Sequence, residues 1–465
     1  MYREIKGYSG GEVYEYTSSM QHDKEILREA VSVVAAHTIH LHEQGIIDQE
    51  AYCRVATHIL GLLENPWVIY EQEGEYEDVW EAIEAWLTKK AGSYAGEIWI
   101  GRSRNDHVST ALRLRAIRGA VSVMKLLNKY RNTIIDKALA SRGKWILLHT
   151  HSQPAQLAPA PCLLLAWEET LASIYSELQH AVEALNRSPL GSSAGAGSIA
   201  PLDPSRLASL LGFTETISSP LYATGSRLDL SLYASTIALL LVELSRMAED
   251  LMLLSSPYVG VIVLPDSHVA TSSIMPHKRN PATLEVLRAR AKLAVSMLSG
   301  LLGVQTGLPS GYSLDLQEVN PIIYWLESEA SHALEVMDSV VGGFTWNDEA
   351  VDRMQKNFIG YGAELAEYIA LTKKIPFREA YKLVVEALRD GDPGMLLEEY
   401  GFKSPVELAS LRRTGCKAEL DIETVLERLQ RDNSSLKRLD AGLSSIQPGL
   451  KEALAKSLRG CEGGN

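Results

Sequence analysis

The segment from Ser272 to Pro281 concentrates side chains that can handle charge. It holds two serine hydroxyls, a histidine, a lysine, an arginine and an asparagine, and a long apolar stretch follows it. Cationic and hydroxyl groups on one loop can bind anions and stabilise a developing negative charge. The alternative is an ordinary solvated loop between helices. The composition of the segment is typical of a mobile, anion-handling loop and not of a packed core.

A second polar cluster lies at residues 101–107, before a stretch of helical periodicity that begins near Ser109. Arg102 and Arg104 supply two guanidinium groups, and Asn105 adds an amide. Arginine binds carboxylates in a bidentate manner, and a helix N-terminus adds amide donors and a favourable dipole. The cluster therefore predicts a carboxylate site, with a helix cap held by ion pairs as the alternative.

A third cluster, at residues 149–156, places two histidines and three hydrogen-bonding side chains before another long helical stretch. A zinc site would need a third ligand, and His149 and His151 at a spacing of two residues are weak support for one. Each histidine, taken alone, is better explained by a structural role.

Long helices must position these clusters. Apolar residues recur at alternating steps of three and four, which places them along one face of a helix. Three series show this spacing, from Leu164 to Leu185, from Leu230 to Leu254 and from Leu284 to Leu301. The one clear strand candidate is the segment 259–264. We therefore predict an all-α fold built around a long helical bundle.

The series from Leu230 is apolar over more than one face, because Leu239, Leu241 and Met252 flank it. A helix that is apolar nearly all round is buried on several sides, which favours contacts between subunits. The central helix of a monomeric bundle is the alternative. A membrane span is not expected, since charged residues interrupt the segment 237–254.

Composition limits the class of protein. A chain of 465 residues with 46% hydrophobic and 22% charged residues is typical of a soluble globular protein of two to four domains. The net charge of −13 argues against nucleic acid and acidic membranes as partners. An anionic substrate would therefore need a local cationic site.

The four cysteines, Cys53, Cys162, Cys416 and Cys461, form no CxxC pair. This spacing predicts reduced thiols in a cytoplasmic protein and no zinc site. The polar start of the chain, residues 1–7, is unlike the apolar core of a signal peptide.

Taken together, these clusters resemble the fumarase/aspartase superfamily. The string SSIMPHKRNP is similar to its signature GSSxMPxKxNP, with Thr271 at the position of the first glycine. The string GRSRND at residues 101–106 is similar to that of argininosuccinate lyases, whereas other members carry different residues there. PLGS at 189–192, YSLDLQE at 312–318 and SMQHD at 19–23 resemble further segments of these lyases.

The resemblance implies a three-domain, all-α homotetramer whose central bundles join into one helical core. The expected division is an N-terminal domain at 1–102, a bundle domain at 103–354 with the signature loop at 270–281, and a small C-terminal domain at 355–465. It also implies reversible cleavage of argininosuccinate to arginine and fumarate, without a metal or another cofactor. Each active site would be shared between chains, with the Asn105, His151 and Ser272 regions coming from three subunits.

The chemistry is an elimination in which a proton next to a carboxylate is removed and a nitrogen leaves. The doubly charged intermediate needs donors and cations already in place, and the leaving guanidinium needs a general acid. By the resemblance, Ser272 is the base, His151 the acid, Glu285 its orienting carboxylate, and Lys278 stabilises the intermediate. The implied substrate-binding residues are Ser19, Arg102, Arg104, Asn105, Thr150, Asn280, Tyr312 and Gln317.

Two departures keep alternatives open. Asn320 stands where these lyases usually carry a lysine that contacts the substrate, and Thr271 replaces the signature glycine. Both changes favour the alternative of a sister lyase that releases fumarate from another succinyl-amine conjugate, such as adenylosuccinate. A catalytically silent structural homotetramer is the second alternative, because a fold does not imply a function.

Overall fold

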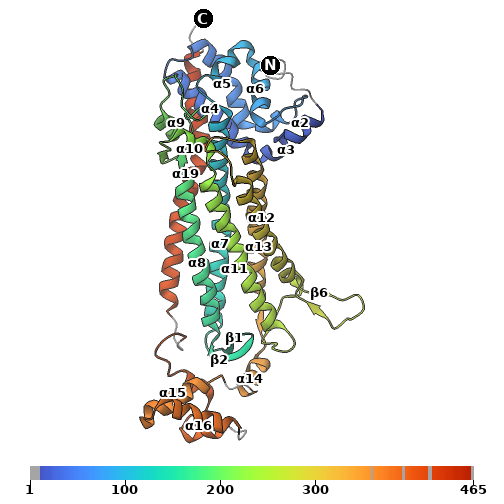
Figure 1. Cartoon of the computed structure of the whole chain (residues 1–465), viewed down its shortest axis with the longest axis vertical. Helices are drawn as coiled ribbons and strands as arrows, with labels where there is room; N and C mark the ends of the chain where they lie inside the picture. The colour runs from blue at the N-terminus through green and yellow to red at the C-terminus, as the bar shows by residue number, and fades with distance from the viewer. Residues whose placement is uncertain (1–10, 358–359, 390–392, 417–420, 462–465) are drawn as a thin grey trace.

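The computed structural model describes residues 11–357, 360–389, 393–416 and 421–461. The molecule is elongated, with a shaft of long helices between a wider group of helices at one end and a small helical group at the other (Figure 1). Both described chain ends lie at the wide end. The polar start of the chain, for which no signal peptide is expected, lies outside the described residues.

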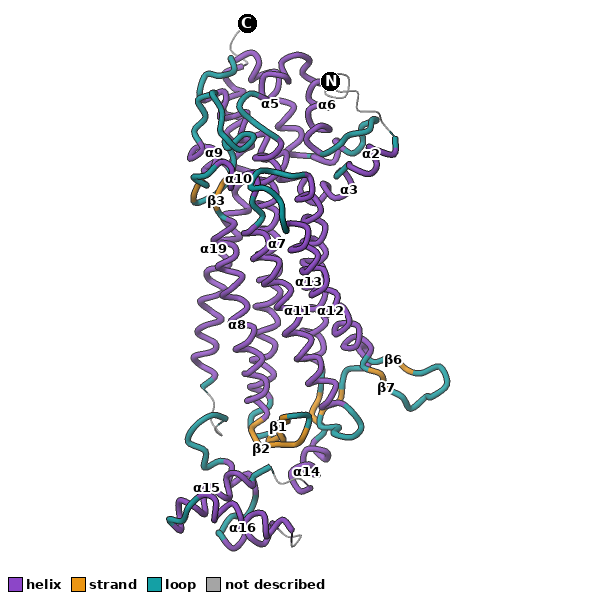
Figure 2. Tube along the Cα trace, viewed as in Figure 1, coloured by secondary structure: helices purple, strands orange, loops and turns teal. Residues whose placement is uncertain are grey.

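Long helices run the length of the shaft, as the sequence predicts (Figure 2). They are α7 Arg104–Ala140, α8 Ala160–Leu185, α11 Leu228–Ser255, α12 Ala282–Gln305, α13 Val319–Gly343 and α19 Ile422–Leu458. At 1.5 Å per residue, the 37 residues of α7 span about 55 Å. The expected all-α fold and the three predicted helical series are confirmed.

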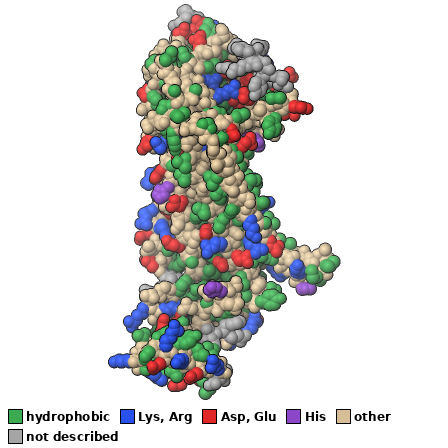
Figure 3. Space-filling model, viewed as in Figure 1, with side chains coloured by type: hydrophobic (Ala, Val, Ile, Leu, Met, Phe, Trp, Pro, Cys, Tyr) green, Lys and Arg blue, Asp and Glu red, His purple; other side chains and the backbone are tan. Residues whose placement is uncertain are grey.

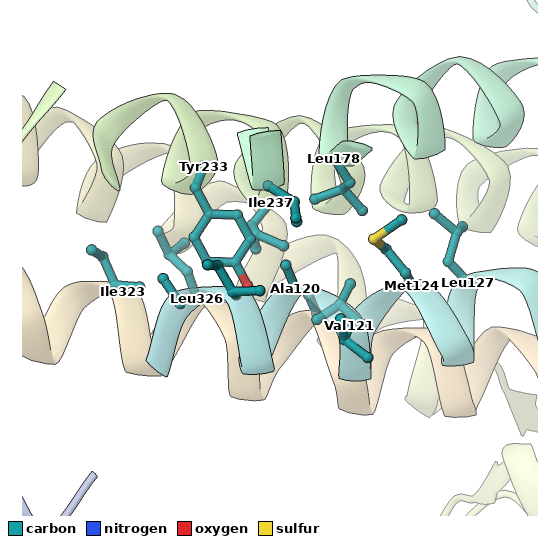
Figure 4. Close-up of a cluster of buried hydrophobic side chains, with 14 of the residues drawn as sticks. Ala120, Val121, Met124, Leu127, Leu178, Tyr233, Ile237, Ile323 and Leu326 are labelled. Carbon is teal, nitrogen blue, oxygen red and sulfur yellow. The ribbon is translucent and has the colours of Figure 1, made fainter. Parts of the chain in front are cut away.

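The core of the shaft forms where four of these helices meet. Every residue of the predicted series in α8 and α11 is buried. Figure 4 shows side chains of α8, α11 and α13 directed toward those of α7, among them Leu178, Tyr233, Ile237, Leu326, Ala120 and Val121. Burial of each large apolar side chain contributes about 1.5–3 kcal/mol, so this seam fixes the relative positions of the helices.

At the wide end one helix packs against α7, and two more pack against that helix and against each other. These are α4 Leu27–Glu43, α5 Gln49–Glu64 and α6 Val79–Ala91. Shorter elements surround them: α2 Glu12–Thr17, α3 Met20–Asp23, η1 Lys24–Ile26, η2 Pro66–Ile69, η3 Gly92–Trp99, α9 Pro204–Leu210, α10 Pro220–Gly225, η5 Leu314–Glu318 and η6 Arg459–Cys461.

The narrow end has its own small core, formed by residues such as Leu365, Ile369 and Val384. Its helices are α15 Gly362–Lys373, α16 Phe377–Arg389, α17 Pro393–Glu399 and α18 Pro405–Ala409, and α14 Asp348–Asn357 links it to α13. After this group the chain returns along the shaft, because α19 packs against α7, α5 and α4. The division into domains at 102 and 354 stays a prediction.

The strands form short two-stranded ladders. The longest pair is antiparallel, β1 Trp145–Thr150 with β2 Gln153–Pro159, and it carries the two histidines of the third cluster. The remaining pairs are β3 Arg187–Ser188 with β4 Glu215–Thr216, β5 Ile262–Val263 with β8 Thr345–Trp346, and β6 Ala270–Thr271 with β7 Arg279–Asn280. The strand predicted over 259–264 is thus confined to β5, and the β1–β2 hairpin was not predicted.

The expectation of reduced thiols is wrong in this structure, where the cysteines form two disulfides. Cys53 is bonded to Cys461 and Cys162 to Cys416, with Cα–Cα distances of 6.0 and 5.7 Å. The partners are 408 and 254 residues apart in the sequence. Cysteine spacing could not indicate these pairs. The return of the chain along α19 brings Cys461 to Cys53, and the position of the narrow-end group beside the start of α8 brings Cys416 to Cys162.

Helix α11 is long and apolar enough to cross a membrane by length and composition alone, with a mean hydropathy of 1.5 in its most apolar window. Most of that window, 61%, is buried inside the protein, where α11 packs against α8, α12 and α13. The apolar composition is therefore explained by the core of the bundle.

Part of the shaft surface is apolar. Figure 3 shows hydrophobic side chains over the part of the shaft nearer the wide end, with more charged side chains toward the other end. Exposed apolar residues on α11 and α12 include Leu232, Leu239, Leu293, Met297 and Leu302. Contiguous exposed apolar surface of this kind is typical of contacts with another protein chain.

Candidate active site

A cavity of about 740 Å³ lies at the wide end, beside the N-terminus of α7. It gathers residues from α3, α6, η3, α7 and η5 that are far apart in the sequence. Its lining includes many of the predicted substrate-binding residues, namely Ser19, Arg102, Arg104, Asn105, Tyr312 and Gln317.

The N-terminus of α7 forms one wall, and a capping box fixes it. The Ser103 hydroxyl accepts a hydrogen bond from the Asn105 amide at 3.2 Å, and Asp106 Oδ1 accepts one from the Ser103 amide at 3.0 Å. Asp106 Oδ2 also accepts from the amides of Gly191 and Ser193, at 3.1 and 2.9 Å. The helix cap and the cavity wall are therefore the same segment, and the carboxylate site stays a prediction.

The two arginines of the cluster bind carboxylates of the chain itself. Arg104 pairs with Glu77 at 2.9 Å and with Asp78 at 2.8 Å, while Arg102 pairs with Glu84 at 3.2 Å. The Arg102 guanidinium also lies 3.7 Å from the centroid of the Trp99 ring, and burial lowers its pKa to about 10. These ion pairs reduce the capacity of both arginines to bind a substrate carboxylate directly.

Another part of the wall centres on Ser19 and Asp23. The Ser19 hydroxyl donates to Asp23 Oδ2 at 2.7 Å, and the Val79 amide donates to the same oxygen at 3.0 Å. Burial raises the pKa of Asp23 to about 7, although these hydrogen bonds oppose the rise. Gln317 Nε2 donates to the Thr17 carbonyl at 3.3 Å, which holds η5 against this wall.

Arg227, which was not singled out in the sequence, also lines the cavity. It is 3% exposed, and it donates to the carbonyls of Thr224 and Ser226, both at 3.1 Å, while its Nε has no hydrogen-bond partner. Its guanidinium lies 5.9 Å from the Tyr312 ring centroid, and burial lowers its pKa to about 10. The sequence signal was a single arginine directly before a long apolar helix.

The cavity is therefore mixed in charge, because carboxylates line it as well as arginines. Asp23, Glu77, Asp78 and Glu84 contribute the carboxylates and were likewise not singled out in the sequence. Burial raises the pKa of Asp78, an effect that the charge of Arg104 opposes. A lining of this kind can hold a ligand that carries cationic and anionic groups together.

The histidine cluster lies at the opposite end of the shaft, on the tip of the β1–β2 hairpin (Figure 2). Thr150 pairs with Gln153, so His151 and Ser152 form the two-residue turn between the strands. Both have positive φ, 53° for His151 and 58° for Ser152. The turn exposes the Thr150 and His151 side chains, whereas His149 is half-buried and burial lowers its pKa.

The signature loop also lies away from the cavity. It projects from the shaft as the hairpin between β6 and β7 (Figure 1). The Ser272 hydroxyl accepts hydrogen bonds from the Met275 amide at 3.2 Å and the Ile274 amide at 3.4 Å. Lys278 is exposed on this loop, Asn280 belongs to β7, and Glu285 lies in the first turn of α12.

The predicted site residues thus fall into two groups at opposite ends of the shaft. The cavity holds the predicted binding residues except Thr150 and Asn280, while these two and the predicted catalytic residues lie toward the narrow end. Since helices of about 40 to 55 Å separate the ends, one chain does not bring the two groups together.

The chain is similar in sequence to known lyases. A family model described as lyase matches residues 15–295. The argininosuccinate lyase of Pyrobaculum calidifontis is 39% identical over 409 residues, which cover 87% of this chain and 94% of that protein. The argininosuccinate lyase of Sulfurisphaera tokodaii is 39% identical over 379 residues, with 82% of each chain covered.

A solved structure shares the fold. The crystal structure of an EDDS lyase in complex with formate matches with a TM-score of 0.85 and 23% sequence identity. The match covers 97% of this chain and 95% of that chain. At 23% identity this similarity shows that the two proteins share a fold.

Proposed function

This chain belongs to the lyase family of the fumarase/aspartase superfamily, and from that premise we propose that it is a carbon–nitrogen lyase that cleaves argininosuccinate reversibly to arginine and fumarate. The observation that carries the choice of substrate is the mixed charge of the cavity at the start of α7. The Asp23 carboxyl, which is held by Ser19 and Val79 and not by an arginine, suits a cationic group of an arginine-derived substrate, while Arg227 and Asn105 suit its carboxylates.

Other superfamily substrates fit this cavity less well. Malate and aspartate are small anions that gain little from a wall of carboxylates. Adenylosuccinate carries a phosphate, which needs cations that are free to bind it. Arg102 and Arg104 are already paired with Glu84, Glu77 and Asp78.

In the proposed mechanism, Ser272 removes the proton next to the succinyl carboxylate. The Met275 and Ile274 amides directed at its oxygen favour the alkoxide, because hydrogen bonds to a charged form lower the pKa of the group. Lys278 and Asn280 hold the succinyl carboxylates and stabilise the doubly charged intermediate. His151, oriented by Glu285, protonates the leaving guanidinium.

This mechanism requires a homotetramer with active sites shared between subunits. Within a single chain, the cavity and the residues Ser272 and His151 lie at opposite ends of the shaft. Other copies of the chain must therefore supply Ser272 and His151 to each active site. The exposed apolar residues of α11 and α12 support association through the shaft. We place the enzyme in the cytoplasm because it resembles argininosuccinate lyases, since the two disulfides remove the argument from reduced thiols. We propose no nucleic acid, membrane, metal or cofactor as a partner.

The test is release of fumarate, measured by ultraviolet absorbance, with argininosuccinate, adenylosuccinate, malate and aspartate offered in turn. The proposal expects argininosuccinate to give the highest kcat/KM. A higher value for adenylosuccinate would identify a sister lyase instead. Absence of fumarate with every substrate from folded tetramers would leave a structural homotetramer.

The sister lyase has one specific observation in its favour. Asn320 is buried in the cavity wall, and its Oδ1 has no hydrogen-bond partner. An amide at this position offers an uncharged contact where argininosuccinate lyases usually present a lysine. A substrate with a neutral polar group there would satisfy Asn320 better than a carboxylate.

A further inference from the structure

The outer edge of strand β2 is bound to the helical group at the narrow end. The Leu157 amide donates to the Gly360 carbonyl at 2.7 Å, and the Leu157 carbonyl accepts from Arg412 Nη2 at 2.6 Å. The Arg412 guanidinium also donates to Glu364 Oε1, with Nε at 2.8 Å. Gln156 Nε2 donates to the same carboxylate oxygen at 2.9 Å. One ion pair therefore holds both the backbone and a side chain of β2.

Packing and a covalent bond reinforce these hydrogen bonds. Gly360 is buried, and a Cβ added there would collide with the Leu147 side chain and lie 3.0 Å from the Leu157 amide nitrogen. The disulfide between Cys162 and Cys416 joins the segment after Arg412 to the start of α8, directly beyond β2. The hairpin is thus clamped by backbone contact, an ion pair and a disulfide. We call Gly360, Glu364 and Arg412 the hairpin clamp.

The hairpin needs such support because it is a two-stranded ladder with an unfavourable turn. An isolated two-stranded hairpin is marginally stable in water. Turns with positive φ at both central residues favour Asn and Gly, whereas here they are His151 and Ser152. Holding non-glycine residues in this conformation costs of order 1–3 kcal/mol each, so the surrounding structure must enforce it.

We propose that Arg412 and Glu364 are positioning residues for His151, acting through β2 and the turn. The inference rests on the proposed function, in which His151 protonates the leaving nitrogen. Leu157 is six residues from His151, about 20 Å along an extended strand, so movement at the clamp is carried to the turn. A misplacement of about 1 Å can reduce a rate by about a hundredfold.

The decisive variant is Arg412→Met, which removes the donors to Leu157 and Glu364 but keeps much of the apolar volume. We expect kcat to fall about 10- to 100-fold while KM changes less than about threefold, because the clamp lies away from the cavity and Thr150 is the one predicted binding residue on the hairpin. Amide hydrogen exchange in residues 145–159 should become faster. Arg412→Lys keeps a charged donor and should recover part of the loss.

The matched control is Arg428→Met. Arg428 is also a partly buried arginine that joins two elements, because it links α19 to Glu168 and Glu169 of α8. It does not belong to the clamp, so this variant should keep wild-type kcat and hairpin exchange even if its thermal midpoint falls. Gly360→Ala disturbs Leu157 from the other side and should reproduce the loss of kcat seen with Arg412→Met.

The pH profile of kcat separates positioning from a loss of folded enzyme. A misplaced His151 changes the pH limb assigned to the acid, whereas a smaller amount of intact enzyme lowers kcat equally at every pH. An Arg412→Met enzyme with wild-type kcat, or one that loses activity with an unchanged profile, would overturn the inference.

Failure of the proposed function has a different outcome. If the chain is a sister lyase, the same variants are compared with its preferred substrate; if it is no lyase, the wild type and Arg428→Met both release no fumarate from any of the four substrates. The clamp is then judged by hydrogen exchange and by the NMR titration of the His151 imidazole. If Arg412→Met alters neither, the positioning role is refuted as well.

Discussion

At the residue scale, the chemistry depends on hydrogen bonds that the sequence could not specify in detail. The Ser272 hydroxyl accepts hydrogen bonds from two backbone amides of its own loop. These bonds favour the alkoxide, which supports the role of base for a group with a high intrinsic pKa. The cavity also contains Arg227 and Asp23, and burial lowers the pKa of the Arg227 guanidinium and raises that of the Asp23 carboxyl. The chemical properties of these side chains therefore depend on their hydrogen bonds and on their burial.

Ser272→Ala should abolish turnover and leave folding and substrate binding nearly intact. The hydroxyl lies on an exposed loop that adds little to the core, and its role is confined to the transition state. Steady-state fumarate release, circular dichroism and calorimetric binding of substrate together check this result. Activity within tenfold of wild type, a barrier change of only about 1.4 kcal/mol, would contradict the role of base.

Asp23 should make stability depend on pH near neutrality. Its folded pKa of about 7 exceeds the ordinary value of 3.8, so the folded state binds the proton more tightly than the unfolded state does. This contribution to stability is full at low pH and is lost as pH rises from about 4 to about 7. The largest slope for one proton is about 1.4 kcal/mol per pH unit.

Denaturant unfolding of wild type and Asp23→Asn between pH 4 and 8 measures this effect. The free energy of unfolding should fall more steeply with pH in the wild type than in the variant. Asp106, whose pKa burial also raises to about 7, contributes equally to both proteins and cancels in the difference. Parallel curves would show that Asp23 titrates normally.

At the element scale, close contacts between segments place the cavity residues. Gly225 ends α10 and lies against the loop that precedes Tyr312. A Cβ added at Gly225 would collide with the Ser310 carbonyl oxygen and lie 2.9 Å from the Gly311 carbonyl carbon. The loop that carries Tyr312 can therefore approach α10 only because this residue has no side chain.

Gly225→Ala should displace that loop and weaken substrate binding. We expect a loss of about 1–3 kcal/mol of stability from overpacking and a KM increased more than kcat is reduced. Gly442→Ala is the control, because Gly442 lies within α19 with no atom within 4 Å of the added Cβ. If the two variants had the same KM, the contact at Gly225 would not control Tyr312.

At the scale of the whole molecule, the two disulfides join distant parts of the chain. The bond from Cys53 to Cys461 ties α5 to the C-terminal turn η6, and the bond from Cys162 to Cys416 ties α8 to the helical group at the narrow end. Closing long loops reduces the conformational entropy of the unfolded chain, typically by an amount worth about 2–4 kcal/mol.

Cys461→Ser should therefore lower the thermal midpoint by several degrees under oxidising conditions. Scanning calorimetry with and without an excess of reductant measures the effect. With reductant present, wild type and variant should unfold at the same temperature. A wild-type midpoint that does not respond to reductant, together with titration of four free thiols, would disprove the bonds.

Sharing of active sites is tested by mixing inactive proteins. Ser272→Ala and His151→Ala are each expected to be inactive, and equal amounts would be denatured together and refolded. If the two residues at a site come from different chains, random assembly leaves about a quarter of sites without either substitution. Recovery toward that fraction is expected. Mixed tetramers as inactive as their parents would contradict shared sites.

The sequence by itself determined the long helices and the segments that carry chemistry. Steps of three and four identify α8, α11 and α12, because the periodicity of a helix face is a local property of the chain. The motif residues were likewise visible as strings. Both kinds of information lie within short stretches of sequence.

Only the tertiary structure decided which of these residues meet. It placed Ser19, Arg102 and Tyr312 around one cavity, and it left His151 and Ser272 at the other end of the shaft. It also paired the cysteines across 254 and 408 residues and folded the third cluster as a hairpin. The physical reason is that such contacts depend on how helices of about 40 to 55 Å pack and turn back, which no local pattern encodes.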